Sequence, residues 1–118
     1  MTTQELKNRT KAFALRVIRL VEKLPSGRTA DVISKQLVRS ATSVAANYRA
    51  SCRAKSNADF IAKMGIVEEE ADESAFWMEV ICESGLMKKE LVEELLDEAN
   101  QIVAIVVSSV NTARGHKR

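Results

Sequence analysis

Residues 29–53, TADVISKQLVRSATSVAANYRASCR, decide the fold of this chain. Their apolar side chains recur three or four positions apart, which is the spacing of an amphipathic helix and not the alternation of a strand. A helix with one apolar face has to bury that face against other elements, so the rest of the chain must supply packing partners. The stripe predicted to be buried contains Ile33, Leu37, Val38, Ala41, Val44, Ala45 and Tyr48.

Three further segments show the same helical spacing and are separated by short joints. Pro25 ends the first of them, and Thr29 is the expected N-cap of the helix that follows. Ser56 opens a capping box with Asp59 in the place of the usual Glu, and Gly85 is a natural stop for the third helix. Four long helices with short joints predict an all-α, antiparallel up-down four-helix bundle. The expected bounds are about 3–24, 29–53, 57–84 and 88–113.

Length and composition limit the class of protein. The 118 residues predict one domain, a bundle over residues 1–113, followed by a disordered basic tail at 114–118. Cys52 and Cys82 lack the spacing of a metal or redox motif and are expected to be free thiols. The polar start of the chain does not resemble a signal peptide, and no apolar run is long enough to cross a membrane. We therefore expect a cytoplasmic protein that has no membrane partner.

The small net charge of +2 hides a strong asymmetry along the chain. Residues 1–63 carry a net charge of +9, residues 64–113 carry −10, and the tail adds +3. Blocks of opposite sign in one small domain predict polarised surfaces. Such surfaces attract a polyanion or pair two copies of the chain.

A line of cations follows the second expected helix. On a helical wheel the four members lie within an arc of about 80°, and they extend over about 27 Å. The first expected helix has a similar row at heptad spacing along one edge. We call the first set the basic stripe and the second set the first-helix row. The basic stripe is Lys35, Arg39, Arg49 and Arg53, and the first-helix row is Arg9, Arg16 and Lys23.

Three interpretations of these cations remain open. They form an ordinary solvated face, a track for the phosphates of RNA or DNA, or a surface that pairs with the acidic helix of a neighbouring subunit. No acidic residue is interleaved at i,i+4 to relieve the repulsion, which is unusual for a solvated face. Aromatic platforms for base stacking are largely missing, because Tyr48 falls on the core side.

The residues needed for catalysis or metal binding are missing from the sequence. An acidic edge on the third helix contains Glu68, Asp72, Glu79 and Glu83, but a di-iron bundle also needs Glu-x-x-His motifs. The single histidine, His116, lies in the tail. Neither cysteine has a histidine base, and no glycine-rich phosphate loop is present. We expect no metal, no cofactor and no enzymatic activity.

Apolar residues also occur outside the predicted core face of the third helix. Large exposed apolar and aromatic side chains are enriched at protein interfaces, so these residues predict a homo-oligomer. The alternative is that Trp77 covers the edge of its own bundle. Two residues of the first helix are similarly placed and could supply the complementary surface. The predicted interface residues are Ile66, Phe76, Trp77 and Val80, with Leu15 and Ile18.

The central block, from Arg39 to Val80, closely resembles the four-helix bundle proteins encoded in intervening sequences of bacterial 23S ribosomal RNA genes. Many family members have Glu-Gly shortly after the matching Asn, where this chain has Tyr48-Arg49, which places it in a more basic branch. The resemblance covers about residues 5–112. The matching elements are Arg39, Ser43, Val44, Asn47, Arg49, Ser56, Phe60, Lys63, Glu69, Glu73, Phe76 and Trp77.

The resemblance implies a ring-like homopentamer with no catalytic residues. It also implies kinship with the accessory variability determinant of diversity-generating retroelements, a basic bundle that binds a reverse transcriptase and nucleic acid. Together with the residues, it favours a non-enzymatic oligomer that binds RNA or DNA without sequence preference. The alternative is a protein–protein adaptor whose basic and acidic faces dock subunits or partners. Asn47, at the border of the core, is expected to hydrogen-bond between helices, and the alternative is a contact with a ligand.

Overall fold

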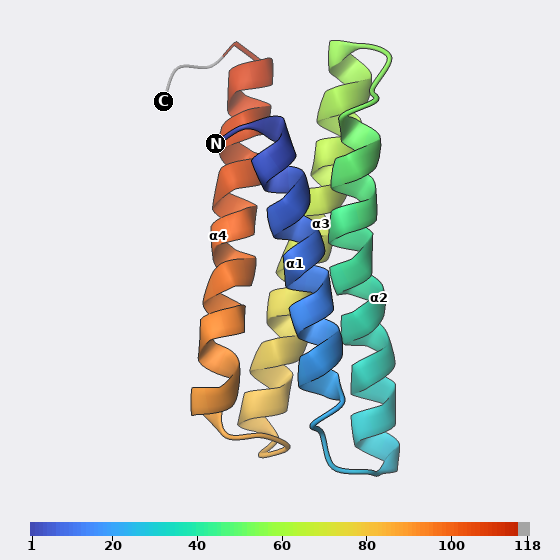
Figure 1. Ribbon diagram of the computed structural model, residues 1–118, viewed down its shortest axis with the longest axis vertical. Helices are drawn as coiled ribbons and strands as arrows, with labels where there is room; N and C mark the ends of the chain where they lie inside the picture. Colours follow the sequence, from blue (N-terminus) through green and yellow to red (C-terminus); the bar gives the residue numbers. More distant parts are fainter. Residues whose placement is uncertain (116–118) are drawn as a thin grey trace.

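The computed structural model describes residues 1–115, which form four antiparallel helices (Figure 1). Each helix packs against its neighbour in the chain, and α1 also contacts α4, so that α1 and α3 lie diagonally across the bundle. The molecule measures 46 × 25 × 20 Å. The expected up-down four-helix bundle is confirmed. The helices are α1 (Thr3–Val21), α2 (Arg28–Ser51), α3 (Asn57–Glu83) and α4 (Lys89–Ala113).

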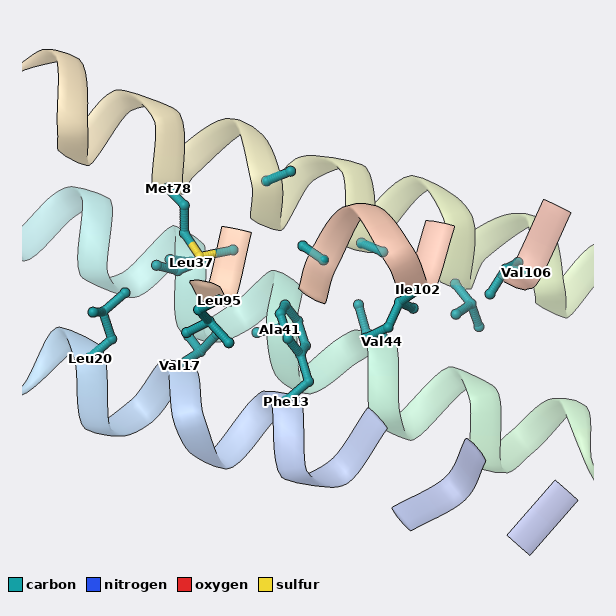
Figure 2. Packing of buried hydrophobic residues seen from close by; sticks show 14 of the residues in the cluster. Phe13, Val17, Leu20, Leu37, Ala41, Val44, Met78, Leu95, Ile102 and Val106 are labelled. Atoms are coloured by element: carbon teal, nitrogen blue, oxygen red, sulfur yellow. The ribbon is translucent and has the colours of Figure 1, made fainter. Parts of the chain in front are cut away.

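One continuous apolar core runs along the axis of the bundle. All four helices contribute to it, and Phe13, Leu37, Met78 and Ile102 are completely buried (Figure 2). In the middle of the bundle Phe13 of α1 points toward the α2 side chains Ala41 and Val44 (Figure 2). Small residues at such positions allow a large ring to fill the space between helices.

The second helix begins earlier than the sequence predicts. The N-cap is Gly27, whose carbonyl accepts from the N–H of Asp31 at 3.0 Å, so the assignment of Thr29 as N-cap was wrong. The φ of Gly27 is +153°, a conformation that glycine adopts readily. The first helix ends at Val21, three residues before the expected end at Leu24. The N–H of Leu24 donates to the carbonyl of Val21 at 3.1 Å, so the chain leaves the helix through a turn ahead of Pro25.

The third helix begins and ends where the sequence predicts. The Ser56 hydroxyl accepts from the N–H of Asp59 at 3.0 Å, and the Asp59 carboxylate accepts from the N–H of Lys55 at 3.1 Å. At the other end, Gly85 adopts a φ of +79°. The N–H of Leu86 then reaches the carbonyl of Ile81 at 3.1 Å, which is the pattern of a Schellman cap.

Replacement of Gly85 by alanine is expected to lower the free energy of unfolding by about 1–2 kcal/mol, because the left-handed φ strains any residue with a Cβ. A Cβ at Gly85 would meet no neighbouring atom, so strain is the only cost. Gly65 is the matched control, since it lies inside α3 with equally open space around it. Gly65→Ala should raise the free energy of unfolding by about 0.5–1 kcal/mol. Urea denaturation measures both; a stabilising Gly85→Ala would contradict the assignment of the cap.

The chain beyond α4 continues as a turn. The N–H groups of Arg114 and Gly115 donate to the carbonyls of Val110 and Thr112 at 2.9 and 3.0 Å. The remainder of the expected tail, residues 116–118, lies outside the described residues. In the part of the chain that the structure describes, no helix is both long enough and apolar enough to cross a bilayer.

Candidate nucleic-acid interface

Arg39, at the centre of the basic stripe, is engaged by carboxylates of its own chain. One guanidinium nitrogen donates to Glu70 Oε2 at 3.0 Å, and another forms an ion pair with Glu73. Trp77 Nε1 also donates to Glu73, at 3.2 Å. The hydrogen bonds with Glu73 and Glu70 raise the pKa of Arg39. Arg39 therefore joins α2 to α3, and its charge is offset before any ligand arrives.

The first-helix row is similarly tied to α4. The guanidinium group of Arg9 donates two hydrogen bonds, of 2.7 and 2.8 Å, to the carboxylate of Glu98. It also donates to the side-chain oxygen of Gln101 at 2.8 Å. The hydrogen bond with Glu98 raises the pKa of Arg9. Arg16 lies 3.5 Å from a Glu94 carboxylate oxygen. Both arginines thus lie beside a carboxylate, and its negative charge weakens their attraction for phosphate.

The other cations of the two predicted sets form no ion pair within residues 1–115. Lys23 borders a small hollow between α1 and α4, together with Arg16 and Glu94. Lys35 stands on the exposed side of α2 beside Val38 and Arg39. The structure therefore divides the seven predicted site residues among several places. Arg16 and Lys23 share the hollow that Glu94 also lines, and Lys35 and Arg39 lie together on α2. Arg49 and Arg53 lie together in a separate cavity that no carboxylate lines.

That cavity is a groove of ≈ 350 Å³ between α1 and α2, which we call the basic groove. Two residues of the basic stripe contribute to it, and two lysines of α1 face them. None of these four cations forms an ion pair within the described chain, and no carboxylate lines the groove. The lining residues are Gln4, Lys7, Asn8, Lys11, Ala45, Ala46, Arg49 and Arg53.

Helix geometry explains how the cations gather. Lys7 and Lys11 are four positions apart, as are Arg49 and Arg53, so the members of each pair lie on one side of their helix. Because α1 and α2 are antiparallel, the start of α1 lies beside the end of α2 (Figure 1). The lining segments are each about 12 Å long. Alanines at positions 45 and 46 occupy little space, which leaves room for an anionic chain between the cations of α1 and those of α2.

Lys7 and Lys11 are functional candidates that the sequence analysis missed. Their i,i+4 spacing near the start of the chain was the available signal. The heptad row of Arg9, Arg16 and Lys23 was selected instead, although two of its members face α4.

Tyr48 does not offer a stacking platform. Its side chain is in the core, with 6 % of its surface exposed, as the periodicity predicts. Burial raises the pKa of Tyr48 to about 12, and the neighbouring Cys52 adds to the rise. Bases cannot stack on a ring that is covered by the bundle, so a nucleic acid would meet side chains that contact its backbone.

The folded protein is expected to titrate its single tyrosine near pH 12, well above the value of an unfolded chain. Between about pH 10 and 12 the unfolded state releases this proton while the folded state keeps it, so stability falls as pH rises through this window. Ultraviolet absorbance of tyrosinate measures the titration. A midpoint near 10 in folded protein would contradict the buried position of Tyr48.

Asn47 does not bridge helices. Its Nδ2 donates to the carbonyl and to the hydroxyl of Ser43, at 2.9 and 2.8 Å, within α2. The expectation of an interhelical hydrogen bond was therefore wrong. A buried hydrogen bond between α2 and α3 is made instead by Ser74, whose hydroxyl donates to the Ser40 hydroxyl at 3.0 Å.

The predicted interface residues differ in exposure. Leu15, Ile66 and Phe76 are exposed, while Ile18, Trp77 and Val80 are partly buried. Trp77 and Val80 pack against the core, and the Phe76 ring meets Trp77 edge-on with centroids 5.0 Å apart. Because α1 and α3 are diagonal, Leu15 and Phe76 belong to different sides of the bundle.

The acidic residues of α3 and α4 do not assemble a metal site. Within residues 1–115 no three His, Cys, Asp or Glu side chains are grouped to hold an ion. Glu70 and Glu73 are instead committed to Arg39. Cys52 and Cys82 are free, and burial raises the pKa of Cys82. His116 lies outside the described residues.

Known proteins of one family match this chain in sequence and in fold. The model of the 23S rRNA-intervening sequence protein family matches residues 2–108. A solved structure of a protein with unknown function, from the S23 ribosomal protein family of Bacteroides thetaiotaomicron, is 33 % identical with a TM-score of 0.82. The alignment covers 88 % of this chain and 96 % of that one. A comparison with curated proteins found no match.

These matches confirm the resemblance that the central block carries. The family model spans nearly the whole chain, and the solved relative shares both the sequence pattern and the bundle. Neither description names an enzymatic activity. This chain belongs to the 23S rRNA-intervening sequence protein family.

Proposed function

We propose that this protein is a non-enzymatic, homo-oligomeric bundle that binds RNA or DNA through the basic groove, without sequence preference. The supporting observation is that Lys7, Lys11, Arg49 and Arg53 converge on one cavity and form no ion pair within residues 1–115. Cations held near one another in this way attract a polyanion, and the release of its condensed counterions supplies the affinity.

The groove is a better phosphate site than the complete basic stripe. Arg39 and Arg9 would have to give up hydrogen bonds to carboxylates before they could bind a phosphate, whereas the groove cations would not. Lys35, Arg16 and Lys23 lie outside the groove and would act at a distance, through the field of the whole face. Contacts from lysine and arginine to phosphate position a nucleic acid without reading its bases.

The proposal places the protein in the cytoplasm and gives it no catalytic step. Both cysteines are free, which fits a reducing compartment. Binding is therefore the activity that needs to be measured.

The first test compares two variants that remove the same amount of charge. Arg49→Gln with Arg53→Gln should weaken the binding of a short labelled RNA about tenfold or more, since each lost charge-assisted contact is worth roughly 1 kcal/mol or more. Lys88→Gln with Lys89→Gln is the control, because both lysines lie at the junction of α3 and α4. Fluorescence anisotropy should show the control within about twofold of wild type. Equal losses, or no loss in either variant, would contradict the proposal.

The exposed apolar residues favour a second candidate function, that of an adaptor which docks subunits or a protein partner. Phe76 has 51 % of its surface exposed, and Leu15 and Ile66 are also exposed. Large apolar groups at the surface are typical of interfaces. The family resemblance implies that copies of the chain assemble as a pentamer. Sedimentation tests assembly, and a clean monomer at micromolar concentration would contradict it. Adaptor function alone predicts no retained nucleic acid at ~150 mM salt, where surface charges are screened.

A further inference from the structure

Two amide side chains stand among the cations of the basic groove. Gln4 Nε2 donates to Asn8 Oδ1 at 3.0 Å, and both residues are exposed and line the groove. Each amide has one acceptor oxygen and two donor hydrogens. After the bond between them, the Gln4 oxygen and the Asn8 NH₂ group remain available. If both amides were turned over, the pair would still leave one oxygen and one NH₂ group free.

A free acceptor beside a free donor matches a hydroxyl group. Phosphate oxygens only accept hydrogen bonds, so the lysines and arginines of the groove satisfy them and the Gln4 oxygen does not. The ribose 2′-hydroxyl both donates and accepts, and it is the group by which a protein distinguishes RNA from DNA. In a nucleic-acid backbone this hydroxyl lies next to the phosphates that the neighbouring cations would hold.

We propose that the basic groove binds RNA in preference to DNA, with the Gln4–Asn8 pair contacting a ribose 2′-hydroxyl while Lys7, Lys11, Arg49 and Arg53 hold the adjacent phosphates. This proposal rests on the proposed function. In a stacked strand the phosphates are spaced about 3.4 Å apart along the helix axis, so a groove about 12 Å long spans at most about three or four of them. Discrimination between sugars therefore depends on few contacts.

The location of the pair separates it from other amides of the chain. Gln101 donates to Asp97 and accepts from Arg9, and Gln36 accepts from Arg39, so each serves a local hydrogen-bond network. Asn100 is exposed on α4, away from the groove. Because Tyr48 is buried and the groove has no aromatic lining, stacking would not mask a contribution from the sugar.

The test measures binding of RNA and DNA oligonucleotides of matched sequence by fluorescence anisotropy at one salt concentration. Wild type should bind RNA about three- to tenfold more tightly, which is the value of one net hydrogen bond. Gln4→Ala with Asn8→Ala should lower RNA affinity more than DNA affinity, so that the preference for RNA disappears. Asn100→Ala is the control and should keep the preference. Both groove amides are exposed, and alanine favours helix, so circular dichroism should show an intact fold.

The possible outcomes separate this proposal from the proposed function. Equal binding of RNA and DNA by wild type would overturn the RNA preference and leave polyanion binding intact. Binding of neither would overturn both. A preference that survives in the double variant would overturn the role of Gln4 and Asn8. RNA with 2′-O-methyl groups keeps the acceptor but lacks the donor, so its affinity should lie between those of RNA and DNA; affinity equal to that of RNA would also contradict the proposed contact.

Discussion

Replacing Leu37 by alanine is expected to lower the free energy of unfolding by about 2–5 kcal/mol, the largest stability effect that we predict for a single side chain. Leu37 has none of its surface exposed and lies near the centre of α2 (Figure 2). Its removal would leave a cavity against close-packed neighbours that can collapse only in part. Urea denaturation monitored by circular dichroism measures the change.

Leu91 is the matched control for this substitution. It is the same residue type on a helix of the same bundle, but 61 % of its surface is exposed. Leu91→Ala should change the free energy of unfolding by no more than about 0.5 kcal/mol. Equal effects of the two substitutions would contradict the placement of Leu37 at the centre of the core.

The largest expected effect on binding comes from reversing the charge of the basic groove. The variant Lys7→Glu, Lys11→Glu, Arg49→Glu and Arg53→Glu should bind RNA about a thousandfold or more weakly than wild type. Each substitution removes an attraction and adds a repulsion at a place where no carboxylate stands now. Fluorescence anisotropy at low salt gives the affinity, and circular dichroism checks that the helices remain.

A control with the same change in charge separates the groove from the field of the whole protein. Lys23, Arg28, Lys35 and Lys88 lie outside the groove lining and are exposed. Their joint replacement by glutamate should weaken binding less than about tenfold, through long-range electrostatics alone. A loss as large as that of the groove variant would show that binding has no particular site on this surface.

The fold could be predicted from the sequence because helical periodicity and local stop signals agree. Ser56 and Gly85 are local signals, and the structure uses both of them. Thr29 was also a plausible cap, but Gly27 comes earlier and lets the helix start sooner. A choice between two competing caps depends on how the loop closes, which local sequence does not determine.

The candidate site could be predicted only in part because ion pairs join residues far apart in the sequence. A helical wheel places Arg39 on an outer face, and its side chain is exposed. It does not show that Glu70, 31 positions later, stands opposite. Arg9 and Glu98 are 89 positions apart. Likewise, nothing local to Lys7 indicates that α2 will bring Arg49 alongside it.

The salt dependence of RNA binding tests most directly whether the basic groove is the site. A single strand that contacts the four groove cations should give a slope of about −3 when the logarithm of the association constant is plotted against that of the salt concentration. The variant with Arg49→Gln and Arg53→Gln should flatten this slope by roughly 1.4, which corresponds to two lost phosphate contacts. An unchanged slope in that variant, or a slope near zero in wild type, would contradict the account.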